Sequence, residues 1–108
     1  MARDYGLEEL VRSNLPRVSF TEKAMFGGLA WLLNGNLVFG ARDAGLLARL
    51  GKGNDGWALA LPDVEPMISR GREMSGWVRA GPDVYGDDDL RRRLIDAALS
   101  YARSLPPK

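Results

Sequence analysis

Apolar residues near the start of the chain recur at the spacing of a helix. Leu10 and Val11 lie three and four residues after Leu7 within residues 5–13, so the three share one face of a predicted helix. Asp4 directly precedes this stretch and belongs to a residue type that caps helix N-termini. The sequence therefore predicts a first helix over these residues.

A longer apolar stripe near the end of the chain predicts a second terminal helix. Asp87 is a natural N-cap, and the acidic residues 88–89 suit the positive end of a helix. Prolines at 106–107 end the pattern. The apolar positions, which recur at spacings of three and four, are Leu90, Leu94, Ala97, Ala98, Tyr101 and Leu105.

Between residues 18 and 50 the period changes to that of strands. The stretch 18–26, VSFTEKAMF, alternates loosely, as an edge strand does. Asn34 and Gly35 separate two apolar runs, LAWLL and LVFGA, which is a strong signal for a hairpin. A second turn is predicted at residues 43–45, before LLARL. Together these segments predict an antiparallel meander of about four strands.

The middle of the chain predicts one more helix and one more strand. Residues 51–66 indicate a turn, a short helix capped by Asn54 or Asp55, and a loop ended by proline. Residues 72–80 predict a strand that is broken by the following Gly-Pro pair. Its alternation places Met74, Gly76 and Val78 on one face and Trp77 and Arg79 on the other. The order is α-β-β-β-β-α-β-α, which predicts a two-layer α+β fold with the helices packed on one face of the sheet.

Length and composition exclude several classes of functional site. A chain of 108 residues forms one domain, residues 1–108. It contains no Cys and no His, which excludes disulfides, thiol nucleophiles, zinc clusters and Ser-His-Asp triads. We predict no catalytic residue, no cofactor and no metal site. No apolar run approaches the ~20 residues that cross a membrane, and the charged N-terminus has no signal core, so we expect a cytoplasmic protein.

Several motifs in a fixed order resemble the N-terminal domain of the TfoX family. They are KAMFGGLAWLLNGNLVFGA, LLARLG, a Pro-Met pair, GREMSGWV and a terminal AALSYARSLPPK. TfoX is a regulator of bacterial competence, and the resemblance implies an α+β fold and an intracellular, dimeric protein. Full-length competence regulators carry a second domain that resembles helix-hairpin-helix modules, whereas this chain resembles the stand-alone form.

One motif departs from the family pattern. Many relatives read Pro-His-x-Arg-Pro-Met, and this chain has Asp63 and Glu65 in place of that His and Arg. The resemblance therefore does not carry over an activity that relies on either residue.

Arginine and tryptophan side chains on the predicted sheet form the main candidate surface. Arginines beside aromatic residues on a sheet suit single-stranded nucleic acid or an anionic ligand, but the same residues suit a protein interface or, for the tryptophans, the core. The candidate residues are Trp31, Arg42, Arg49, Arg70, Arg72, Trp77 and Arg79.

Two other segments offer alternative sites. Lys52, Gly53 and Asn54 lie in GKGNDG, where backbone amides before a helix suit an anion, although the segment matches no nucleotide-binding fingerprint and also reads as a flexible turn. The run of arginines at 91–93 suggests a phosphate-binding face. Acidic residues four positions earlier, at 88 and 89, instead favour intrahelical ion pairs with the arginines at 92 and 93.

Three functions remain open at this level. The first is a non-enzymatic regulatory or protein-interaction module that binds a protein partner or forms a homodimer. The second is nucleic-acid binding through the sheet arginines, against which the net charge of +1 argues. The third is a small-anion sensor or an enzyme with a pocket near GKGNDG.

Overall fold

The computed structural model describes residues 4–15, 20–25, 28–43 and 45–107. Its element order matches the predicted α+β arrangement, with one extra strand and one extra helical turn. In chain order the elements are α1 (Tyr5–Ser13), β1 (Thr21–Met25), β2 (Gly28–Leu33), β3 (Asn36–Arg42), β4 (Gly45–Arg49), α2 (Gly56–Leu59), β5 (Val64–Ser69), β6 (Arg72–Ala80), α3 (Pro82–Tyr85) and α4 (Asp88–Ser104).

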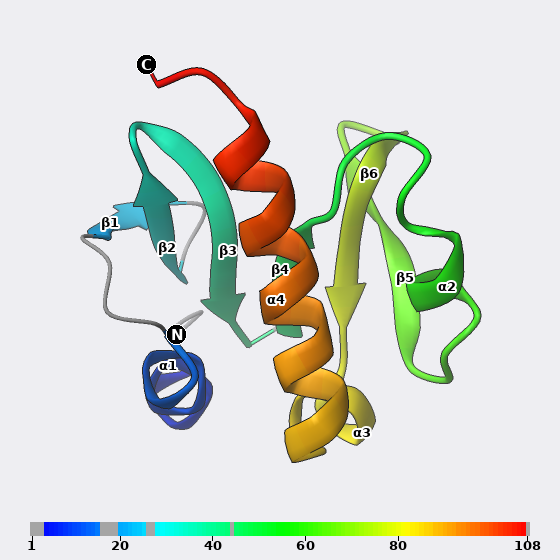
Figure 1. Ribbon diagram of the computed structural model, residues 1–108. Helices are drawn as coiled ribbons and strands as arrows, with labels where there is room; N and C mark the ends of the chain where they lie inside the picture. Colours follow the sequence, from blue (N-terminus) through cyan, green and yellow to red (C-terminus); the bar gives the residue numbers. More distant parts are fainter. Residues whose placement is uncertain (1–3, 16–19, 26–27, 44, 108) are drawn as a thin grey trace.

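The strands form one antiparallel sheet of six strands in the order β1-β2-β3-β4-β6-β5. Helix α4 packs across β3 and β4, and α1 packs against β3, so both terminal helices lie on the same face of the sheet (Figure 1). The main core fills the space between these layers and includes Trp31, Phe39, Val78, Leu94 and Ile95. Within the described residues, no helix is long and apolar enough to cross a bilayer.

Local signals at the ends of the helices and in the first hairpin are confirmed. The Asp4 carboxylate accepts a hydrogen bond from the backbone of α1, and the Asp87 carboxylate accepts two from the first turn of α4. The β2–β3 turn places Asn34 at φ 53° and Gly35 at φ 83°, as a type I′ turn requires. Residues 26–27, which are part of the same motif, lie outside the described residues, as does residue 44 of the second predicted turn.

The segment predicted as a proline-terminated loop contains a strand. Strand β5 lies at the edge of the sheet, where Pro66 is tolerated because an edge position leaves one side of the backbone unpaired. The turn that joins β5 to β6 has positive φ at both Arg70 and Gly71. Because Arg-Gly is a weaker turn signal than Asn-Gly, the sequence pattern did not indicate the β5–β6 hairpin.

A glycine in β6 fixes the loop after β4 against the sheet. Gly76 has φ 85°, and a Cβ at this position would lie 2.5 Å from both the carbonyl carbon of Gly51 and the amide nitrogen of Lys52. The Gly76 carbonyl accepts hydrogen bonds from Leu50 and Gly51, and its N–H donates to the Asp55 carboxylate. This close backbone contact explains the glycine of the GREMSGWV motif.

Replacing Gly76 tests this contact. Gly76→Ala is expected to reduce the free energy of unfolding by about 3 kcal/mol, because a side chain adds steric overlap to an unfavourable positive φ. Gly71→Ala is the matched control: it has φ 77° but open space around it, so about 1 kcal/mol is expected. Urea denaturation measures both values, and equal losses would contradict the packing explanation.

Candidate functional site

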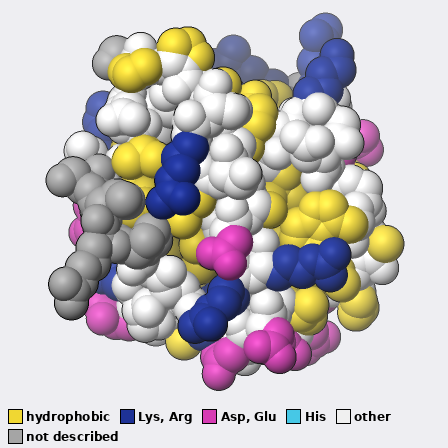
Figure 2. Space-filling model, viewed as in Figure 1, with side chains coloured by type: hydrophobic (Ala, Val, Ile, Leu, Met, Phe, Trp, Pro, Cys, Tyr) yellow, Lys and Arg dark blue, Asp and Glu magenta, His cyan; other side chains and the backbone are white. Residues whose placement is uncertain are grey.

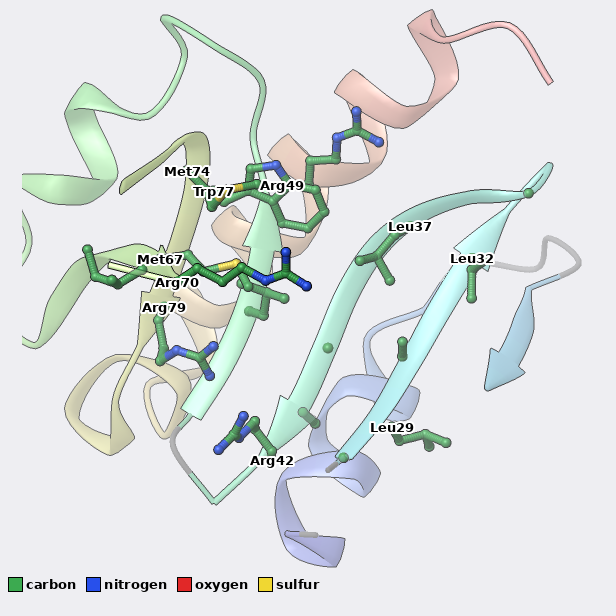
Figure 3. Close-up of a pocket in the computed structure, with 17 residues that line it drawn as sticks. Leu29, Leu32, Leu37, Arg42, Arg49, Met67, Arg70, Met74, Trp77 and Arg79 are labelled. Carbon is green, nitrogen blue, oxygen red and sulfur yellow. The ribbon is translucent and has the colours of Figure 1, made fainter. Parts of the chain in front are cut away.

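The helix-free face of the sheet is hollowed into a groove of about 650 Å³. Figure 3 shows this face with α1 and α4 behind the sheet. The groove combines an apolar floor with basic side chains from β3, β4, the β5–β6 turn and β6. The larger apolar lining residues are Leu29, Leu32, Leu37, Leu47, Met67, Ile68, Met74 and Trp77. The basic ones are Arg42, Arg49, Arg70 and Arg79.

Strand alternation and small side chains create the hollow. Residues that pair across the sheet at the positions of Trp31, Phe39, Ala48 and Val78 point into the core and are fully buried or nearly so. Their neighbours point to the opposite face. One row on that face runs through Ala30, Gly40, Leu47 and Arg79. Because alanine and glycine fill little space, the face is recessed along β2 and β3.

The β5–β6 hairpin forms the most exposed apolar part of the groove. Ile68 is 55% exposed and Met74 is 39% exposed, and both line the groove together with Met67. Large apolar side chains that remain this accessible beside one another are typical of interaction sites. Arg70 lies in the turn of the same hairpin, and Figure 3 shows its side chain extending over the groove.

The described lining of the groove carries an excess of basic side chains. Among its described lining residues there is no Asp or Glu. Burial lowers the pKa of the Arg79 guanidinium, and the nearby charge of Arg42 lowers it further, while Asp43 acts in the opposite direction. The Nε of Arg42 lies 3.5 Å from a carboxylate oxygen of Asp43. On the helix-covered side, in contrast, basic and acidic side chains are intermixed (Figure 2).

Arg49 is held by aromatic rings. The central carbon of its guanidinium lies 5.1 Å from the ring centroid of Trp77 and 5.4 Å from that of Tyr101 on α4. Such cation–π contacts contribute roughly 0.5–1 kcal/mol each at accessible sites. The Arg49 guanidinium therefore contacts one ring of β6 and one ring of α4. It covers part of the Trp77 ring surface.

Of the sequence-predicted surface, Trp31 and Arg72 do not belong to the groove. Of the alternatives left open for Trp31, surface or core, the structure shows the core, because this residue is 0% exposed. Its indole N–H donates to Glu22, which also accepts two hydrogen bonds from Arg12. Arg72 is exposed at the start of β6 but does not line the groove. The remaining predicted residues, Arg42, Arg49, Arg70, Trp77 and Arg79, all line it.

The apolar floor was not singled out from the sequence. The sequence pattern assigned these residues to strands or loops and to no site. In the structure the following residues line the groove: Leu32, Leu37, Leu47, Met67 and Met74. The available signal was the presence of apolar residues on both alternating faces of the strands. That pattern predicts a sheet with apolar surface on both faces, each of which is to be covered by other protein surface.

The candidate anion site at 52–54 is an exposed turn outside the groove lining. The amide of Asn54 donates to the carbonyl of Gly51, and the helix that follows has only four residues. Asp55 occupies the N-cap position of this helix but directs its carboxylate to the amide of Gly76. Gly51 and Asp55 of GKGNDG are therefore explained by the contact of this β4–α2 loop with Gly76 of β6.

Asp63, which stands where the resemblance expects a histidine, organises the start of β5. It has φ 63°, its carbonyl accepts from Gly81, and its carboxylate accepts from the amide of Asp83 in α3. Its contacts are therefore structural. Glu65 is exposed and pairs in register with Arg79.

The arginine run in α4 divides into different roles. Arg91 is only 4% exposed and donates to Asn14, to the carbonyl of Tyr85 and to Asp88. The predicted pairing of Asp88 with the arginine four residues later is wrong, since Asp88 pairs with Arg91, three residues later. Arg93 lies 4.3 Å from the ring centroid of Trp57. Asp87 caps the helix, and the described residues contain no group of three or more acidic side chains placed to hold a metal ion.

Arg91 is predicted to stabilise the fold. Arg91→Met is expected to reduce the free energy of unfolding by about 3 kcal/mol, because it removes three charge-assisted hydrogen bonds donated by a buried guanidinium. Arg92→Met, at the exposed neighbouring position, is expected to change it by less than about 0.5 kcal/mol. Thermal and urea unfolding measure both variants. Equal, small effects would show that Arg91 is free for another role.

Comparison with known families supports the assignment of the scaffold. The family model of the TfoX N-terminal domain matches residues 13–102, which include the whole sheet and nearly all of α4. Neither the curated proteins nor the solved structures gave a match. The strands that build the groove all lie within the matched region. On the strength of that match, this chain belongs to the TfoX N-terminal domain family.

Proposed function

We propose that this chain is a non-enzymatic protein-interaction module with a regulatory role, and that its groove binds an acidic, amphipathic segment of a partner protein. The observation that carries the proposal is the combination of an apolar floor with four arginines and no acidic residue among the described lining. Apolar side chains of the partner would cover the exposed Ile68 and Met74, while its carboxylates would pair with the arginines.

The chemistry of the groove favours binding over catalysis. Its described side chains are apolar groups and arginines, and an arginine stays protonated at ordinary pH and so does not act as a general base. The chain has no His or Cys to supply a proton shuttle or a thiolate. Arginine does suit the recognition of carboxylates, because its planar fork binds two oxygens at once.

Two other occupants fit the charges and surfaces less well. Nucleic acid calls for a basic tract with open stacking platforms, whereas the net charge is +1 and Arg49 already lies against the Trp77 ring. A second copy of this chain, docked symmetrically through the same face, would set arginines against arginines. An acidic partner avoids both difficulties.

A labelled peptide tests this proposal. A peptide of alternating Leu and Glu with about nine residues would span roughly 30 Å when extended, which matches the 30 Å extent of the domain. It is expected to bind, and Arg70→Gln is expected to weaken binding about fivefold by removing one charge-assisted contact. Arg92→Gln, on the opposite face, is the matched control and should leave affinity unchanged. Fluorescence anisotropy measures each affinity.

Comparison probes separate the alternatives. Peptides of Leu with Gln and of Ser with Glu should each bind more weakly than the Leu–Glu peptide, because each lacks one half of the recognition. A single-stranded oligonucleotide of similar charge should not compete. Saturable binding of the oligonucleotide with loss in Arg70→Gln, or no binding of any peptide, would contradict the proposal.

A further inference from the structure

We propose that Arg42 and Arg79 form a carboxylate-binding subsite at one end of the groove, and that a single carboxylate of the bound protein segment sits between their guanidinium groups. This inference rests on the proposed function, since it names the contact that would select an acidic partner. Figure 3 shows the two guanidinium groups directed toward one another across the start of β4.

Arg79 has a donor that the described structure does not satisfy. Its Nη1 atom is buried and has no hydrogen-bond partner among the described residues. Buried polar groups are nearly always hydrogen-bonded, and leaving a charged donor unpaired is costly. Because the Arg79 side chain lines the groove, a ligand bound there would supply the acceptor that the described residues do not.

Within the described residues, Arg79 makes no ion pair with the acidic residue that lies opposite it in the sheet. Glu65 pairs with Arg79 in the β5–β6 register, and opposite charges at such positions commonly attract one another. The neighbouring charges that act on Arg79 are instead those of Arg42 and Asp43. Two guanidinium groups thus share one end of the groove although like charges repel.

The local charge fits one carboxylate. Arg42 and Arg79 contribute two positive charges, and Asp43, which lies 3.5 Å from Arg42, contributes one negative charge. Among these described groups the positive charges exceed the negative ones by one, which matches one carboxylate better than a phosphodiester chain with its repeated series of charges. The adjacent floor is apolar because Leu47 lies opposite Arg79 in the β4–β6 pairing, so water is partly excluded and the charge-assisted bonds are strengthened.

A first experiment needs no ligand. If Arg79 is held unpaired for binding, Arg79→Met should raise the midpoint of thermal unfolding of the free protein by about 3 °C, because it removes a desolvated charge and its repulsion with Arg42. Arg70→Met, in the exposed turn, is the control and should leave the midpoint unchanged. A lower midpoint for Arg79→Met, or failure to fold, would show that Arg79 has a structural role and would overturn the proposal.

A second experiment combines substitutions in the peptide with a substitution in the protein. Each Glu of the Leu–Glu peptide is replaced by Gln in turn, and the affinities are measured for the wild type and for Arg79→Gln. At one Glu position, the replacement is expected to weaken the affinity of the peptide for the wild type about tenfold. The same replacement should weaken its affinity for Arg79→Gln by less than about twofold. An equal effect of Arg79→Gln on every peptide would overturn the subsite while leaving the proposed function standing.

A simple carboxylate keeps the two proposals distinguishable. If no peptide binds the wild type, the proposed function fails, and the subsite is tested with sodium acetate against sodium chloride at equal ionic strength. The subsite predicts that acetate raises the unfolding midpoint of the wild type more than that of Arg79→Gln. Equal shifts in the two proteins would overturn it.

Discussion

The architecture depends on burying one face of a six-stranded sheet under two terminal helices. Trp31, Phe39 and Val78 reach zero exposure only because α1 and α4 cover that side. The helices lie on the same face, so the opposite face keeps its apolar side chains without a helical layer over them (Figure 1). The groove is the direct consequence, since leucine and methionine remain accessible where a second layer would otherwise lie.

Charge on the two sides of the sheet follows the same division. On the helix-covered side, charged residues serve the fold: Arg91 bridges α4 to Asn14, and Arg12 meets the Glu22 carboxylate that also receives the Trp31 indole. In the groove, four arginines gather without an acidic lining residue in the described part. Arg91 and Arg12 find their partners within the fold, whereas the Nη1 donor of Arg79 is buried without a hydrogen-bond partner among the described residues.

Much of the scaffold could be predicted because its signals are local. The caps at Asp4 and Asp87 and the turn at Asn34 and Gly35 each follow from the chemistry of a few adjacent residues. Alternation along β6 correctly placed Trp77 and Arg79 on one face, but Met74, which it placed on the other face, lines the same groove. The positive φ of Gly76 lies between them and breaks the alternation. The family motifs added the order in which these elements occur.

The features that escaped prediction depend on distant contacts. The register shifts between Trp31 and Leu32, which breaks simple alternation, and only the position of the helices decides which face is core. The sequence pattern does not distinguish Arg91 from its exposed neighbour Arg92. The difference arises because Arg91 bonds to Asn14, which is far away in the sequence. Strand β5 contains Pro66, and its place at an edge is a property of the whole sheet.

The central claim is that the helix-free face binds an acidic protein segment. Amide chemical-shift mapping during titration with the Leu–Glu peptide tests it most directly, because every strand reports separately. We expect the shifts to concentrate at groove residues of β3, β4 and β6, with the largest near Arg79 and Leu47, and to be small along the outer face of α4. Shifts that concentrate on α4 and α1 would contradict this account of the molecule.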